Sequence, residues 1–138
     1  MKLIFLDIDG VLNKKTTQSP SSCVLEEKQL ALLAELVKKS RAKIILTSSW
    51  RLSSDEPWRE PLLNAGISVT DKTARLNGNN RQREILLYLT EHGEVDSFVI
   101  LDDQANGFGK LRGNRVLVDP RTGLTEENIA KALKILGV

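Results

Sequence analysis

Two aspartates near the N-terminus, Asp7 and Asp9, have the residue type and the spacing expected of a site that does chemistry. They follow the uninterrupted apolar run 3–6, and Gly10 comes directly after them. Such a short apolar run is typical of a strand buried on both faces of a parallel sheet. A carboxylate taken out of water there is costly unless it is paired or binds a metal ion. We therefore expect the two acids to form a catalytic centre at the carboxyl end of this strand, where α/β sheets bind ligands.

Polar residues also follow the other apolar runs of the chain. The run AKIIL ends in Thr47 and Ser48, FVIL ends in Asp102 and Asp103, and VLV ends in Asp119. In a parallel sheet the carboxyl ends of the strands lie along one edge, and the ends of the first, second and fourth strands are expected to lie together there. Asp119, directly before Pro120, is expected to be a turn acid, and Cys23 has no partner nearby that would make it a nucleophile.

Strands and amphipathic helices alternate along the chain. Strands are expected at 3–6, 42–46, 67–70, 98–101 and 116–118, and helices at 24–39, 81–91 and 125–136, with a helical stretch at 53–66 that Pro61 breaks. This alternation predicts an α/β fold, a Rossmann-like three-layer sandwich of about five parallel strands with helices on both faces. No internal repeat or linker divides the chain, so residues 1–138 are expected to form a single domain.

The composition is that of a globular domain, with 41% hydrophobic and 28% charged residues. Lys and Arg number 20 against 18 Asp and Glu, and this near balance gives no argument for nucleic-acid binding by itself. The single cysteine, Cys23, excludes an internal disulfide and fits a reducing compartment. No run approaches the roughly 20 apolar residues of a membrane span. We expect a cytoplasmic monomer without a membrane partner.

Several carboxylates at one sheet edge suit Mg²⁺, which prefers oxygen ligands and often binds a substrate phosphate as well. Asp7, Asp9 and one of Asp102 or Asp103 would share the ion, which would offset their mutual repulsion. One carboxylate could then act as the nucleophile in phosphoryl transfer, while a second acid moves the proton. A hydroxyl at the second strand end and a cation would hold the remaining phosphoryl oxygens. The candidate cations are Arg81, Arg83, Lys72 and Arg51.

These motifs together resemble a known family. The segments LDIDGVLN, ILTSSWR and ILDD resemble, in order and separation, the first, second and fourth motifs of the haloacid dehalogenase (HAD) superfamily of phosphohydrolases. With a helix start that contains Arg81, Glu84 and Ile85, and a late GLT, the chain resembles more closely the small HAD domains associated with "Swiss Army Knife" RNA-repair proteins. The resemblance covers nearly the whole chain and implies a HAD-like fold.

The resemblance implies roles for the acids. Asp7 would be the nucleophile and Asp9 the general acid and base. Mg²⁺ would bind Asp7, the main-chain carbonyl of Asp9 and the acids of the fourth motif, with Asp103 favoured over Asp102 as the direct ligand. The dehalogenase branch of the superfamily lacks the second acid, so Asp9 favours phosphoryl chemistry.

The resemblance also implies the groups that hold the phosphate. Thr47 fits the hydroxyl of the second motif, with Ser48 as the second choice. Arg81 is favoured as the cation of the third motif because it begins a helix shortly before the fourth motif, and Lys72 is its rival. Trp50 and Arg51 could clamp a nucleotide beside the site, although Trp50 could equally pack in the core.

The HAD family controls access with cap domains inserted after the first or third strand. Here those positions hold only residues 13–23 and 71–80, which are too short for a folded cap. A capless domain resembles family members that act on large or exposed phosphorylated substrates, such as polynucleotide ends (RNA among them) or phosphoproteins. Small phosphate esters remain an alternative.

Two functions of other classes also fit the pattern. A receiver-like module would accept a phosphoryl group as a switch, and a catalytically silent domain would bind RNA ends without releasing phosphate. The acid two residues after the nucleophile favours the enzyme, because Asp9 would speed hydrolysis of the phosphoryl intermediate.

Overall fold

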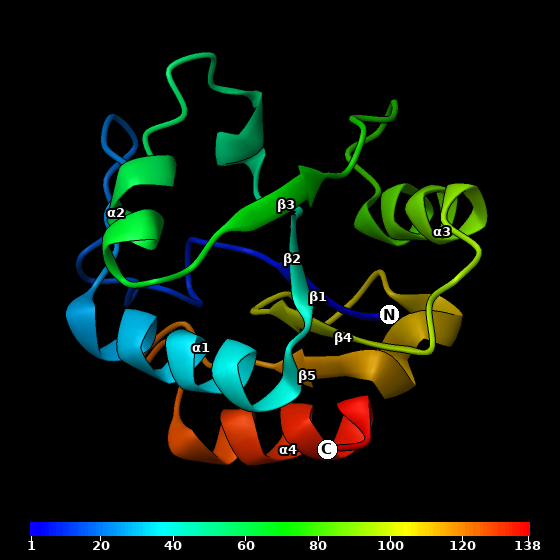
Figure 1. Cartoon of the computed structure of the whole chain (residues 1–138). Helices are drawn as coiled ribbons and strands as arrows, with labels where there is room; N and C mark the ends of the chain where they lie inside the picture. The colour runs from blue at the N-terminus through cyan, green and yellow to red at the C-terminus, as the bar shows by residue number, and fades with distance from the viewer.

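A five-stranded parallel sheet forms the centre of the computed structural model, which describes residues 1–138 (Figure 1). The strands are β1 (Lys2–Leu6), β2 (Lys43–Leu46), β3 (Val69–Lys72), β4 (Ser97–Asp102) and β5 (Arg115–Leu117). They lie in the order β3-β2-β1-β4-β5, and every neighbouring pair is parallel. The chain therefore leaves the central strand β1 at the point where the strand order reverses, which is where sheets of this type bind ligands.

Helices cover both faces of the sheet. They are α1 (Glu27–Ser40), α2 (Arg59–Asn64), α3 (Arg81–Glu91) and α4 (Glu126–Leu136), together with the short 3-10 helices η1 (Ser49–Leu52) and η2 (Gly109–Asn114). Figure 1 shows α1 and α4 next to each other against one face, and α3 lies on the other. The three-layer α/β sandwich predicted from the sequence is confirmed. None of the helices combines the length and the apolar character that a membrane crossing requires.

Alternate residues of β1 belong to two separate hydrophobic cores. Ile4 and Leu6 pack in the larger core with α1, α2 and α4, whereas Leu3 and Phe5 pack in the smaller core with α3. The same alternation holds in β2 and β4. Because side chains alternate along a strand, Asp7 continues the series of Leu3 and Phe5 toward the α3 face.

Local signals fix the start of the helices that matter for the site. The side chain of Asn80 caps α3 by accepting a hydrogen bond from Arg83 N at 3.1 Å, so Arg81 is the first helical residue. Thr125 caps α4, the helix expected at 125–136, and forms a reciprocal capping box with Asn128. Both helices therefore begin where short polar side chains satisfy free backbone N–H groups.

Three element predictions need correction. The third strand runs over Val69–Lys72 instead of 67–70, because it is an edge strand whose outer residues are exposed and polar, so apolar periodicity does not mark it. The first helix begins at Glu27, three residues later than expected. The stretch 53–66 holds only α2, and Pro61 lies in its first turn, where no backbone N–H is needed inside the helix.

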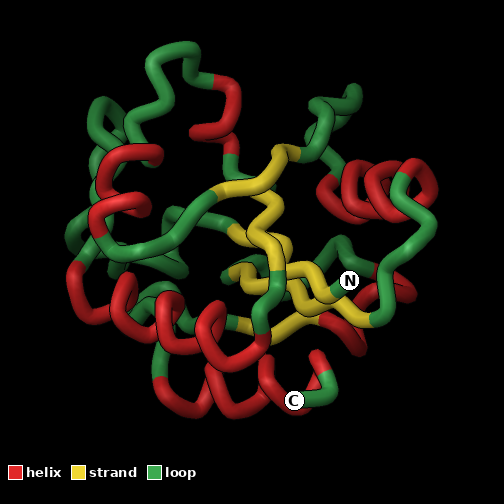
Figure 2. Tube along the Cα trace, in the orientation of Figure 1, coloured by secondary structure: helices red, strands yellow, loops and turns green.

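The two positions where a cap could be inserted hold no helix or strand. Residues 7–26 connect β1 to α1 and residues 73–80 connect β3 to α3, and both appear entirely as loop in Figure 2. Neither connection therefore holds a folded cap over the carboxyl edge of the sheet.

Candidate active site

Three polar residues continue the three central strands past their last apolar residues. Asp7, Thr47 and Asp102 directly follow residues that are paired with one another across β1, β2 and β4. The backbone pairing continues beyond these pairs, since Asp7 N donates to Leu101 O at 3.1 Å and Thr47 N donates to Leu6 O at 2.8 Å. With this register kept, the three polar side chains share the α3 face of the sheet edge.

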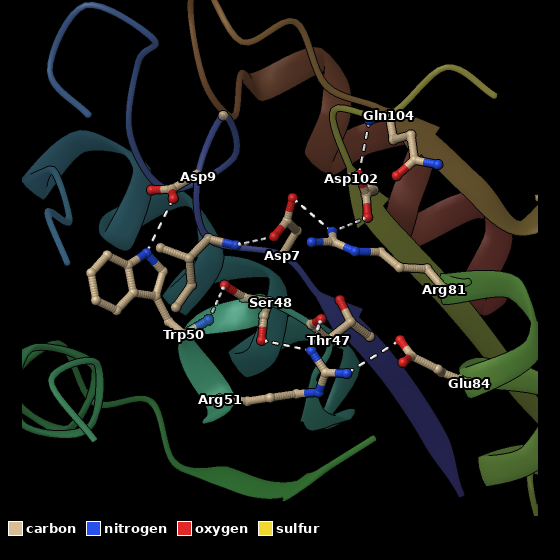
Figure 3. Close-up of polar contacts among 12 residues, drawn as sticks. Asp7, Asp9, Thr47, Ser48, Trp50, Arg51, Arg81, Glu84, Asp102 and Gln104 are labelled. Carbon is tan, nitrogen blue, oxygen red and sulfur yellow. Dashed lines mark hydrogen bonds and ion pairs between the residues drawn. The ribbon is translucent and has the colours of Figure 1, made fainter. Parts of the chain in front are cut away.

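Three carboxylates and one guanidinium gather at this edge. Single ligand atoms of Asp7, Asp102 and Asp103 lie within 4.8 Å of one another. Arg81 Nη1 lies 2.9 Å from Asp7 Oδ2 and 2.7 Å from Asp102 Oδ2, and Figure 3 shows its guanidinium between the two carboxylates. The sheet register and the start of α3 thus bring together residues that are 95 positions apart in the chain.

The other candidate cations have partners elsewhere or none. Arg51 pairs with Glu84 at 3.2 Å, and the two side chains are only 5% and 3% exposed. Lys72 lies 3.8 Å from Glu56, and Arg83 is exposed on α3. None of these cations forms an ion pair with Asp7, so the geometry favours Arg81 over its rivals.

The cluster carries more negative than positive charge. Burial raises the pKa of Asp7 to about 7, with Asp102 and Asp103 adding to the increase and Arg81 opposing it. Burial also raises the pKa of Asp103. For Arg81, burial by itself lowers the pKa, but the contacts with Asp7 and Asp102 outweigh it and raise the pKa above its ordinary value. Three carboxylates that offer only oxygen ligands, balanced by a single cation, therefore fit a hard divalent ion such as Mg²⁺.

Gly10 lets Asp103 approach the loop that follows β1. Its φ is +83°, and a Cβ at this position would lie 2.2 Å from Asp103 Oδ2. The glycine that directly follows the second acid is therefore needed both for its positive φ and to leave space for the Asp103 carboxylate. Asp103 forms no ion pair, whereas both oxygens of Asp102 accept hydrogen bonds, from Arg81 and from Gln104 N.

The Asp9 carboxylate lies outside the three-carboxylate cluster. Its Oδ1 accepts a hydrogen bond from Asn13 Nδ2 at 3.0 Å. Its Oδ2 accepts one from Trp50 Nε1 at 3.1 Å, as Figure 3 shows. The Asp9 side chain therefore does not belong to the carboxylate cluster that could hold a metal ion. For Asp9, the expected metal ligand is still the main-chain carbonyl oxygen. Two donors, one from the loop after β1 and one from η1, hold the carboxylate in one orientation, which suits a group that transfers protons.

The two candidate hydroxyls have different surroundings. Ser48 Oγ accepts a hydrogen bond from Trp50 N at 3.2 Å and caps η1. Thr47 Oγ1 is buried and has no hydrogen-bond partner. A buried hydroxyl without a hydrogen-bond partner is costly. The Thr47 hydroxyl at this edge is therefore suited to donate a hydrogen bond to an oxygen of a bound ligand.

A family model described as the HAD domain in Swiss Army Knife RNA repair proteins matches residues 3–129. The chain belongs to this family. No curated protein and no solved structure matches it. In this HAD domain the residues of the first, second and fourth motifs lie at the ends of the three central strands.

The buried ion pair of Arg51 and Glu84 holds the backbone of the second motif of the HAD domain in place. Arg51 Nη1 donates to the main-chain carbonyls of Thr47 and Ser48 at 2.8 and 3.0 Å, and its Nε donates to Thr73 O at 2.9 Å. Glu84 of α3 neutralises the same guanidinium (Figure 3). One arginine therefore ties η1, the loop after β3 and the helix that carries Arg81 into one unit.

Sequence reasoning missed several of these partners. Asn13, Trp50 and Glu84 each lie inside a quoted motif, but no local pattern tells which distant group a polar side chain will meet. Asp119 and Cys23 lie outside the carboxylate cluster. Asp119 pairs with Arg121 at 2.8 Å, and burial raises the pKa of the Cys23 thiol to about 12, which disfavours the reactive thiolate.

Proposed function

We propose that this HAD domain is a Mg²⁺-dependent phosphomonoester hydrolase that works through a phosphoryl group on Asp7. The observation that carries the proposal is the set of groups on one face of the sheet edge: Asp7 lies beside two further acids and Arg81, and the Thr47 hydroxyl nearby lacks a partner. Family membership supports the same chemistry. A carboxylate at such a place can attack phosphorus, and the surrounding groups can neutralise the charge of the transferred phosphoryl group.

The two steps use Asp7 and Asp9 in turn. Asp7 Oδ attacks phosphorus, a bond forms between them, and the bond to the ester oxygen breaks while Asp9 gives that oxygen a proton. Asp9 then takes a proton from water, whose oxygen attacks phosphorus and breaks the bond to Asp7, releasing phosphate. The hydrogen bonds from Asn13 and Trp50 hold Asp9 in the orientation that both proton transfers require.

The remaining groups of the site bind and orient the phosphoryl group. Asp7, Asp103 and the main-chain carbonyl of Asp9 would hold Mg²⁺, with Asp102 beside them, and the bound ion supplies charge neutralisation and polarises a phosphoryl oxygen. Arg81 and the Thr47 hydroxyl donate hydrogen bonds to the other oxygens.

The proposed substrate is a phosphorylated nucleic-acid end or another large, exposed phosphomonoester. The absence of folded insertions at 7–26 and 73–80 supports an open site, and the family description names RNA repair. RNA ends are therefore the first substrates to test, with small phosphate esters as the alternative.

The decisive experiment measures phosphate release from p-nitrophenyl phosphate with and without Mg²⁺. We expect many turnovers per enzyme molecule with Mg²⁺, and loss of activity in Asp7→Asn, which keeps the shape of the side chain but removes the nucleophilic charge. Stoichiometric phosphorylation without turnover would instead indicate a phospho-accepting switch, and binding of RNA ends without any phosphate release would indicate a silent module.

A substrate panel then separates the proposed classes. It compares 3′- and 5′-phosphorylated RNA and DNA ends, nucleotides, sugar phosphates and phosphopeptides under the same conditions. Nucleic-acid ends are expected to give the highest kcat/KM. A wide margin in favour of small sugar phosphates would contradict the argument from the open site.

A further inference from the structure

A polar cleft of about 370 Å³ opens beside the carboxylate cluster. Leu52 is the single hydrophobic residue that lines it, and the polar lining includes Arg75, Asn79, Arg81 and Gln104. A cleft with this lining is unsuited to an apolar ligand. It presents guanidinium and amide donors, which match a charged oxygen-rich group.

The cleft and the proposed catalytic centre have residues in common. Arg81 lines the cleft, and its Nη1 also contacts Asp7 and Asp102. Gln104 lines the cleft as well, and its backbone N–H donates to Asp102 Oδ1 at 2.8 Å. A ligand group in the cleft therefore lies next to a phosphoryl group on Asp7.

Arg75 supplies the uncompensated charge of this cleft. The charge of Arg51 is neutralised by Glu84, and that of Arg81 by Asp7 and Asp102. Arg75 is exposed and forms no ion pair and no side-chain hydrogen bond. The start of α3 at Arg81 adds the partial positive charge of a helix N-terminus on the same side.

The backbone on both sides of Arg75 is held by the buried ion pair. Thr73 N donates to Leu46 O at 3.0 Å and Thr73 O accepts from Arg51 Nε, while Leu76 N donates to Glu84 Oε2 at 2.9 Å. An exposed arginine on a free loop would be an ordinary solvated side chain. Here its neighbours are anchored to the sheet and to α3, so the guanidinium is presented at a defined place beside the site.

We propose that the cleft binds a second phosphate of the same substrate, with Arg75 as its main contact, so that the preferred substrates carry a phosphate or phosphodiester next to the scissile monoester. This inference rests on the proposed function for the position of the scissile group. A guanidinium paired with a phosphate gives two parallel charge-assisted hydrogen bonds, and Asn79 and Gln104 offer further donors at the same cleft.

The test compares matched substrates in the wild type and in Arg75→Gln. The substrates are a nucleoside 3′-monophosphate, the 5′-monophosphate, the 3′,5′-bisphosphate and a dinucleotide with a terminal phosphate. We expect kcat/KM for the bisphosphate or the dinucleotide to exceed that of the better monophosphate by about tenfold, and Arg75→Gln to remove most of this ratio through KM. The bisphosphate and dinucleotide arms separate a small-molecule phosphate from a polymer phosphodiester.

Arg83→Gln is the matched control, since it removes the same charge from an exposed arginine of α3 that does not line the cleft. The ratio should stay at its wild-type value in this variant, and Arg75→Lys should keep part of it. No preference for a second phosphate in the wild type, or an equal loss of the ratio in both glutamine variants, overturns the proposal.

A binding measurement separates this inference from the proposed function. Calorimetric titration of Asp7→Asn protein with the mono- and bisphosphates, in the presence of Mg²⁺, should show tighter binding of the bisphosphate, and the additional Arg75→Gln change should remove the difference. Tighter binding of the bisphosphate, without phosphate release by the wild type, would support the second-phosphate site and contradict the proposed hydrolase function. Phosphate release by the wild type, without any difference in binding, would support the hydrolase function and contradict the second-phosphate site.

Discussion

Asp7 and Asp9 are two residues apart, and their surroundings assign them different work. The Asp7 carboxylate is buried among two acids and Arg81, where it can hold a metal ion and attack phosphorus. The Asp9 carboxylate turns away to Asn13 and Trp50, whose neutral N–H groups orient it without forming an ion pair. Ile8, which is buried between them, therefore separates a charged centre from a proton-transfer group.

At the residue scale, Trp50→Phe tests the orientation of Asp9. The change keeps an aromatic ring and removes the N–H that donates to Asp9 Oδ2, so Asp9 should sample unproductive orientations. We expect kcat for phosphate release to fall about tenfold with little change in KM. Trp58→Phe is the matched control, because Trp58 Nε1 is buried without a partner and does not contact Asp9; this variant should keep kcat. Equal kcat in both variants would contradict the orienting role.

The pattern of residues in the sequence was enough to predict that Asp7 meets Asp102 and Asp103 at one edge of the sheet, but not that the Asp9 carboxylate would lie apart from them. It could not predict which polar side chains support them. The contact of Trp50 with Asp9 spans 41 positions, and the pair of Arg51 with Glu84 joins two different elements. Such contacts depend on how loops pack after the sheet has formed, and residue type alone does not encode the partner.

At the element scale, the loop after β1 and the end of β4 fit together through Gly10. Gly10→Ala places a methyl group against the Asp103 carboxylate, so the ligand set for Mg²⁺ should be displaced. We expect the Mg²⁺ concentration for half-maximal activity to rise by about tenfold or more. Gly66→Ala is the control, since its φ of +81° gives similar backbone strain while its Cβ would meet no atom within 4 Å. A similar Mg²⁺ requirement in both variants would show that strain, rather than the clash, is responsible.

The strands with uninterrupted apolar runs were predicted correctly, whereas the bounds of the edge strand β3 were not. The buried strands β1, β2 and β4 have apolar runs because helices cover both of their faces. Strand β3 has a single neighbour and three exposed residues, so its sequence resembles a loop. Tertiary pairing, rather than local preference, makes it a strand.

At the scale of the whole molecule, the strand order places all the acids of the cluster at the centre of the sheet. Asp7 follows the central strand β1. Asp102 ends the neighbouring strand β4 and Asp103 follows it, while Thr47 follows β2 on the other side. Alternation of strands and helices predicts a parallel sheet but leaves the strand order open. The observed order gathers negative charge in the interior, and this arrangement should have a measurable cost for folding without metal.

Metal-free protein should lose stability as the pH rises from about 4 to about 7. The pKa of Asp7 is raised by burial to about 7 from 3.8, so the folded state keeps a proton that the unfolded chain has already released in this range. Unfolding then becomes more favourable with each step in pH, at most about 1.4 kcal/mol per unit from this group. The shift at Asp103 has the same direction. Thermal denaturation in the presence of a chelator measures the effect.

The Asp7→Asn change and bound Mg²⁺ should each offset the loss of stability that ionisation of the cluster causes at high pH. The amide cannot ionise, and Arg81 keeps Asp102 as a partner, so Asp7→Asn should melt at a higher temperature than the wild type at pH 8 and at a similar temperature at pH 4. Mg²⁺ binds only the folded site, and it should raise the melting temperature of the wild type more at pH 8 than at pH 5, because protons compete for the same oxygens. A melting temperature of Asp7→Asn at or below that of the metal-free wild type at pH 8 would show that Arg81 already balances the cluster, and that the excess charge does not exist.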